Sequence, residues 1–170
     1  MKTVKEFVHE LKMWLKDAKK LVIMGIGNEM RGDDAVGIKV IEKLRGRVPN
    51  WVVLLICGST PENFLGTVER LKPTHILMVD AAKLNSEPGS IALIDTNLIS
   101  GIAISTHYMP LHISAEYLRR TTKAKIKLLA IQPQDISLHV GLTEKLEKTT
   151  EIIAKLLCEV FNQVSSQQSS

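Results

Sequence analysis

The chain alternates between short apolar runs and segments with helical spacing. Three runs, at 21–26, 51–57 and 76–79, are almost continuous in large apolar residues, which is typical of strands buried on both faces of a sheet. Weaker runs at 90–94 and 126–131 predict two more strands. The apolar residues between the runs recur at three- and four-residue steps and predict helices at 33–45, 61–71, 114–121 and 143–161. The pattern favours an α/β fold with a single domain, in which a doubly wound, mostly parallel five-stranded sheet is flanked by helices on both faces.

The strand predicted at 90–94 has a different connection from the others. Only residues 81–89 separate it from the preceding strand, and this link contains Asn85, Pro88 and Gly89, which are turn-forming residues. A parallel connection needs a longer crossover, usually with a helix. We therefore expect this strand to be antiparallel and to lie at an edge of the sheet.

Residues 1–20 precede the first strand and form an amphipathic helical pattern. Apolar residues recur at helical spacing between lysines and acids, at Val4, Phe7, Val8, Leu11, Trp14, Leu15 and Ala18. We expect this helix to cover one side of the core; docking to a partner or to a membrane surface is the alternative, because the segment holds six lysines against three acids. The chain thus divides into an N-terminal helical extension at 1–20, the α/β domain at 21–164 and a disordered tail, SSQQSS, at 165–170.

Length and composition fit one compact domain in the cytoplasm. The 170 residues are 45% hydrophobic, enough to bury a substantial core. The longest apolar run, at 51–57, is far shorter than the roughly 18–20 residues of a transmembrane helix, and no secretory signal pattern opens the chain. Cys57 and Cys158 are far apart and lie in apolar segments, so we expect buried thiols and not a disulfide or a zinc site. Beyond residue 20 the charge is nearly balanced and no basic stripe is interleaved with aromatics, so we expect no nucleic-acid partner.

Three chemically capable residues map to the carboxyl ends of the predicted strands. Asp34 follows the first strand, Asp80 ends the third, and His107 precedes the helix at 114–121. Ligands of doubly wound sheets bind at this edge. Two carboxylates and one imidazole can contact a divalent metal with coordination positions left open, or act as acid and base. The remaining histidines are expected to be surface or structural residues: His9, His75, His112 and His139.

The motif MGIGNEMRGDDAVG at 24–37 also has to be weighed against phosphate-binding loops. A dinucleotide fingerprint would need a glycine where Met30 stands, and no acid follows the second strand. Asp33 and Asp34 would also repel a phosphate at the start of the helix, where we expect Asp33 to be a cap or first-turn residue. A phospho-acceptor signalling domain is disfavoured, because a glutamine and a proline follow the fifth strand where that fold needs a lysine. The other polar and glycine residues of the motif are assigned to loop hydrogen bonding (Asn28) and to backbone geometry (Gly25, Gly27 and Gly37).

Several short motifs together resemble the nickel–iron hydrogenase maturation endopeptidases. The matching stretches are GIGNEMRGDDAVG (25–37), GSTPENF (58–64), ILMVDAA (76–82), EPG (87–89), STHYMPL (105–111) and AIQP (130–133). They occur in the family's order and span most of residues 21–160. The stretch STHYMPL resembles the corresponding stretch in the subgroup that processes hydrogenase 3-type large subunits.

The resemblance implies a cytoplasmic protease that removes a short C-terminal extension from a large-subunit precursor after nickel has been inserted. Its catalytic and metal-contacting residues would be Asp34, Asp80 and His107, the same three residues that the strand ends indicate. Nickel would arrive on the precursor instead of being permanently bound, and three protein ligands would leave positions for the precursor's cysteines. Because no serine or cysteine is paired with a base and no H-E-x-x-H motif is present, a metal- or carboxylate-activated water is the expected nucleophile.

Two alternatives from other classes stay open at this point. A nickel-checking chaperone that holds the precursor without cutting it would carry the same motifs, and only turnover distinguishes it from a protease. A small-molecule nucleotide enzyme is the other alternative, and titration of nucleotides against the fluorescence of Trp14 and Trp51 tests it.

Overall fold

A twisted sheet forms the centre of the molecule. The computed structural model describes residues 2–97 and 110–170, and within these the sheet has five strands in the order β2-β1-β3-β5-β4. The strands are β1 (Leu21–Ile26), β2 (Val52–Gly58), β3 (His75–Ala81), β4 (Ile91–Asp95) and β5 (Lys125–Ile131). β1 is parallel to β2 and β3, and β5 is parallel to β3. The predicted doubly wound, mostly parallel sheet is confirmed.

β4 runs antiparallel to β5 at one edge of the sheet. The link from β3 turns through two residues with positive φ, Asn85 at 53° and Gly89 at 86°. The Gly89 amide then donates to the carbonyl of Gln132, just beyond β5, at 2.9 Å. This bond places the start of β4 beside the end of β5, so the chain must run back along β5. The predicted antiparallel edge strand is therefore confirmed.

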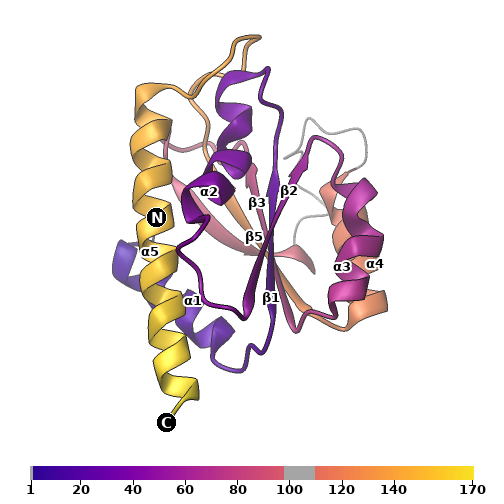
Figure 1. Ribbon diagram of the computed structural model, residues 1–170. Coiled ribbons are helices and arrows are strands. Elements are labelled where there is room, and N and C mark those ends of the chain that lie inside the picture. Colours follow the sequence, from indigo (N-terminus) through magenta and orange to yellow (C-terminus); the bar gives the residue numbers. More distant parts are fainter. Residues whose placement is uncertain (1, 98–109) are drawn as a thin grey trace.

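Helices cover both faces of the sheet (Figure 1). One face carries α1 (Val4–Leu15), α2 (Val36–Leu44) and α5 (Glu144–Gln168), and the other carries α3 (Leu65–Leu71) and α4 (Leu111–Thr122). Each face has its own buried cluster of apolar side chains. Along β3, Leu77 and Val79 pack in the first cluster while Ile76 and Met78 pack in the second. This two-sided burial explains the continuous apolar runs from which the strands were predicted.

Two of the predicted helices begin with a 3-10 turn. η1 (Gly32–Ala35) precedes α2, and η2 (Pro61–Phe64) precedes α3. Within η1, the Asp33 amide donates to the carbonyl of Asp135 at 2.9 Å. A distant loop therefore holds this residue, and the regular α-helix begins only at Val36.

The N-terminal helix α1 belongs to the core of the first face. Thr3 and Glu6 close its first turn as a capping box. Phe7, Leu11 and Leu15 are buried in one cluster with side chains of α5 and the sheet. The expectation that this helix covers one side of the core is confirmed. In the part of the chain that the structure describes, no helix is long and apolar enough to cross a membrane.

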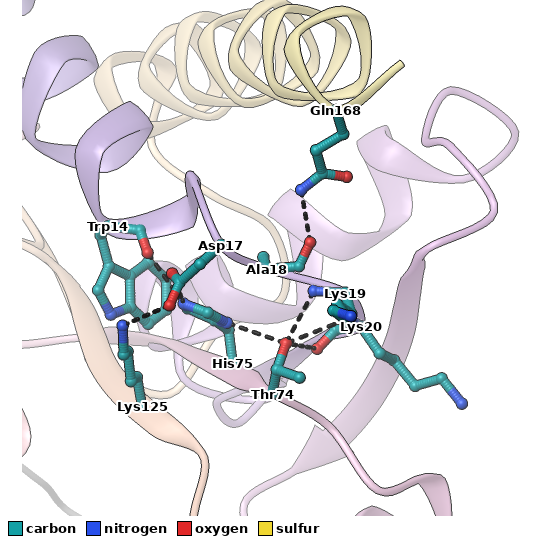
Figure 2. A network of polar contacts seen from close by, with 9 residues as sticks. All are labelled: Trp14, Asp17, Ala18, Lys19, Lys20, Thr74, His75, Lys125 and Gln168. Carbon is teal, nitrogen blue, oxygen red and sulfur yellow. Dashed lines mark hydrogen bonds and ion pairs between the residues drawn. The ribbon is translucent and has the colours of Figure 1, made fainter. Parts of the chain in front are cut away.

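A buried histidine connects the end of this N-terminal segment to the sheet (Figure 2). His75, the first residue of β3, has Nε2 2.9 Å from the Trp14 carbonyl oxygen and Nδ1 3.0 Å from the Thr74 hydroxyl. Because a carbonyl only accepts, Nε2 must carry the proton in the neutral ring. Asp17 lies 3.4 Å from Nε2 and also pairs with Lys125 at 2.8 Å. His75 is thus a structural residue, in agreement with the prediction.

The C-terminal residues differ from the prediction. We expected residues 165–170 to be disordered, but α5 continues to Gln168. The indole N–H of Trp51 donates to the Ser165 hydroxyl at 2.7 Å, and the Gln168 amide group donates to the Ala18 carbonyl at 2.6 Å. Polar side chains support this last part of the helix, so a prediction based on its lack of apolar residues was wrong.

Candidate functional site

The carboxyl ends of β1 and β3 lie side by side, and the β1–α2 connection is packed tightly against them. At Gly37, in the first turn of α2, a Cβ would lie 2.2 Å from the Val79 carbonyl oxygen. At Gly27, just after β1, a Cβ would lie 2.0 Å from the Asp34 carbonyl oxygen. Only glycine permits such approach, which confirms the backbone roles predicted for these two residues. We call this region, where the parallel strands end, the carboxyl edge.

Asp34 lies in η1 with its side chain buried. Its Oδ2 accepts a hydrogen bond from the Asn28 amide at 3.1 Å, and its own amide donates to the Arg31 carbonyl at 3.0 Å. The Asn28 side chain in turn accepts from the Met30 amide at 2.9 Å. The loop is therefore closed by its own polar groups, as predicted for Asn28, and it holds the Asp34 carboxylate at the carboxyl edge.

Asp80 is the last residue but one of β3 and is fully buried. Strand alternation places its side chain on the face of Ile76 and Met78, which is the face covered by α3 and α4. η1 packs against β3. The structure therefore brings Asp34 and Asp80 to the same edge of the sheet.

His107, the third predicted site residue, lies outside the described residues. The helix that follows it, α4, begins at Leu111 on the same face as the Asp80 side chain. Within 2–97 and 110–170, no group of three or more His, Cys, Asp or Glu is arranged to hold a metal ion. The catalytic and metal-contacting roles of Asp34, Asp80 and His107 stay predictions.

Asp33 has a role that the sequence did not predict. We expected it to be a cap or a first-turn residue, and it does lie in the first turn of η1, which has no side-chain cap. Its fully buried carboxylate instead accepts four hydrogen bonds from the loop between β5 and α5. The donors are the amides of Gln134 (2.9 Å), Asp135 (3.0 Å) and Thr143 (2.7 Å) and the Thr143 hydroxyl (3.0 Å). One carboxylate thus fixes both ends of this loop, residues 132–143, beside Asp34.

Cys57 lies at the carboxyl end of β2. Burial among apolar side chains raises the pKa of its thiol to about 12, so the thiol stays protonated at neutral pH. Cys158 on α5 is half-buried, and burial is also the main cause that raises its pKa. Because the thiolate is the reactive form of cysteine, neither residue is suited to act as a nucleophile.

Known proteins that resemble this chain agree with one another. The family model for the hydrogenase maturation proteases matches residues 38–160. A putative hydrogenase maturation protease of Methanocaldococcus jannaschii is 36% identical over an alignment of 158 residues that covers 88% of this chain and 93% of the relative. The hydrogenase 3 maturation protease of Escherichia coli K12 is 33% identical over 138 residues, which are 80% of this chain and 87% of the relative. The crystal structure of a NiFe hydrogenase maturation protease from Thermococcus kodakarensis superposes with a TM-score of 0.84 at 34% identity, over 90% of this chain and 99% of that one.

Proposed function

We propose that this chain, which belongs to the hydrogenase maturation protease family, removes the C-terminal extension from a nickel–iron hydrogenase large-subunit precursor after nickel has been inserted. Family membership makes the chain an endopeptidase that acts on a hydrogenase precursor. The nickel dependence and the order of events are the proposal. The observation that carries it is the pair of buried carboxylates, Asp34 and Asp80, at one carboxyl edge.

Nickel enters this proposal as part of the substrate. Carboxylate oxygens and an imidazole nitrogen are suitable ligands for a divalent ion of this kind. Asp34, Asp80 and His107 would contact nickel that the precursor already holds. A precursor without nickel would lack these contacts and would not be positioned for cleavage.

Hydrolysis needs a water molecule and a base. The water oxygen adds to the carbonyl carbon of the scissile peptide bond, and a carboxylate accepts the proton that the water loses. The leaving amine takes up a proton as the carbon–nitrogen bond breaks. Asp34 and Asp80 are both placed at the carboxyl edge, and either can accept and return this proton.

Mass spectrometry of the precursor tests the function directly. A nickel-loaded precursor and an unloaded one are each incubated with catalytic amounts of the protein. We expect a C-terminal peptide to be released from the loaded precursor alone, with many turnovers per protein molecule. Saturable binding without any cleavage would support the nickel-checking chaperone, and equal cleavage of both precursors would contradict the nickel check.

Replacing Asp80 by asparagine keeps the shape of the side chain and removes its charge. We expect Asp80→Asn to fold normally, as judged by circular dichroism and thermal unfolding, and to lose at least 100-fold in the cleavage rate, since a base contributes on the order of 10²–10⁴. Glu144→Gln, which changes an exposed carboxylate at the start of α5, is the control and should keep full activity. Full activity of Asp80→Asn would remove this residue from the site.

A further inference from the structure

Three large apolar side chains stand exposed on the two loops that frame the carboxyl edge. Met30, in the β1–η1 loop, is 59% exposed, and Leu138 and Val140, in the loop before α5, are 79% and 75% exposed. We propose that these three residues form a docking surface for the precursor protein, next to the site that cleaves it. This inference rests on the proposed function, and it names how the substrate is held.

Backbone hydrogen bonds bring the two loops that carry these residues together. The His139 amide donates to the Met30 carbonyl at 3.1 Å, and the Gly32 amide donates to the His139 carbonyl at 2.8 Å. Arg31 and His139 form the bridge between the two loops. Leu138 and Val140 flank His139, and Met30 precedes Arg31, so this bridge places the three exposed residues next to one another.

The loops are held in place before any partner arrives. Asp33 fixes residues 134, 135 and 143 through its four hydrogen bonds. Gly32, with φ of 52°, lets the His139 ring pack closely, because a Cβ there would lie 2.3 Å from the ring. Figure 1 shows the loop before α5, in orange, rising beside the β1–α2 connection. A preorganised apolar surface loses little conformational entropy when it binds.

The precursor is the occupant that fits this position. Met30 is only four residues from Asp34, and Asp33 links the rest of the surface to the same turn, so the surface is continuous with the proposed active site. Three side chains present at most a few hundred Å², whereas a stable dimer buries about 800 Å² per partner. The surface is therefore too small to hold a second copy by itself. It is suited to extend the contacts that a large substrate already makes at the active site.

Steady-state kinetics of the double variant Leu138→Ser/Val140→Ser tests the inference. Both side chains are exposed, so we expect an unchanged thermal unfolding temperature. Loss of binding that is equal in the ground and transition states raises KM alone, and we expect KM for the nickel-loaded precursor to rise at least tenfold while kcat stays within twofold. The control is Val4→Ser/Ile152→Ser, which removes two apolar side chains that are also exposed, by 57% and 56%, from α1 and α5. Its KM should equal that of the wild type.

Several results would overturn the inference. An unchanged KM, or a loss confined to kcat, would show that the loops act only on the geometry of the active site. If the wild type is a dimer and the double variant is a monomer, the surface binds a second copy. If the wild type binds anionic vesicles and the double variant does not, the surface binds a membrane. If the wild type does not cleave, calorimetric titration of the precursor separates the two proposals. Binding that the double variant loses would keep the docking surface while the endopeptidase proposal fails, and absence of binding by the wild type would end both.

Discussion

At the scale of single residues, the neighbouring acids Asp33 and Asp34 have different roles. η1 is a 3-10 helix, in which successive side chains diverge by about a third of a turn. Asp33 therefore reaches the loop at 132–143, whereas Asp34 contacts the Asn28 amide. The two-acid motif combines a structural anchor with a candidate catalytic group.

Replacing Asp33 by alanine removes the acceptor of three backbone amides and one hydroxyl. Each donor left without a partner costs on the order of 1–3 kcal/mol, so we expect Asp33→Ala to lose about 3 kcal/mol or more of unfolding free energy. Urea unfolding measures this loss, and faster hydrogen exchange at Gln134 and Thr143 locates it. Asp135→Asn is the matched control in the same loop, since its exposed carboxylate accepts only from Ser137 in the hydrogen bonds described. Equal losses in the two variants would contradict the anchor role.

Sequence reasoning found the residues that stand next to recognisable strands. Asp34 and Asp80 could be assigned to one edge, because the carboxyl ends of parallel strands meet there. The anchor role of Asp33 could not be predicted, since its partners are 101 to 110 residues away and no periodicity connects them. The docking role proposed for Leu138 and Val140 could not be predicted either. In the sequence they are two apolar residues in a loop, and only the structure places them beside Met30.

At the scale of elements, the placement of α2 depends on one glycine. A Cβ at Gly37 would lie 2.2 Å from the Val79 carbonyl oxygen and 2.3 Å from that of Ile26. Both atoms belong to the backbone of the central strands, which cannot move without disturbing the sheet. The close approach of α2 to β1 and β3 sets the position of η1 and hence of Asp34.

We expect Gly37→Ala to push α2 away from the sheet. Overpacking of this kind costs about 1–3 kcal/mol, and cleavage should fall further than stability alone explains because η1 moves with the helix. Gly66→Ala in α3 is the control, since a Cβ there meets only the flexible end of Arg70 at 3.4 Å. Alanine is the better helix former by about 1 kcal/mol, so Gly66→Ala should be neutral or stabilising in thermal unfolding. A neutral Gly37→Ala would contradict the tight contact.

Element types were easier to predict than element ends. Strands buried on both faces were recognised by their unbroken apolar runs, and the short link at 81–89 was enough to predict the antiparallel β4. The 3-10 turn η1 was missed because its residues are held by long-range hydrogen bonds, as Asp33 shows. The last turns of α5 were missed for the related reason that Ser165 and Gln168 are supported by polar partners distant in the sequence.

At the scale of the whole molecule, the candidate site and the His75 network lie at opposite ends of the parallel strands. The carboxyl edge holds Asp34, Asp80 and the docking surface. The opposite end holds the network around His75, which connects the segment after α1 to β3 and β5 (Figure 2). The N-terminal helix is therefore attached to the sheet by apolar packing and by one buried imidazole.

This attachment predicts a dependence of stability on pH. Burial lowers the pKa of His75, and the nearby carboxylate of Asp17 opposes the shift only in part. The unfolded chain, with an imidazole pKa of about 6.5, takes up a proton before the folded protein does. The contribution of His75 to the free energy of unfolding is therefore fully present above the unfolded pKa. It decreases as the pH falls towards the lowered folded pKa.

Urea unfolding at pH 7.5 and at pH 5.5 measures this effect. We expect the wild type to lose more unfolding free energy between the two values than His75→Gln, whose side chain can still donate to the Trp14 carbonyl but does not titrate. The other histidines and the carboxylates titrate in both proteins, so the difference between the two losses isolates His75. Identical losses would mean that the pKa of His75 is unshifted, and a smaller loss in the wild type than in His75→Gln would mean that folding raises this pKa.

The burial of Cys57 affects whether its sulfur can compete with other ligands for a metal ion. A thiol with a pKa of about 12 offers no thiolate at neutral pH, and the thiolate is the form that captures metal ions. A precursor that brings its nickel to the carboxyl edge would therefore meet carboxylates there, while the sulfur of Cys57 stays inert. The protonated thiol of Cys57 is therefore no competitor for the ligands that already hold the metal on the precursor.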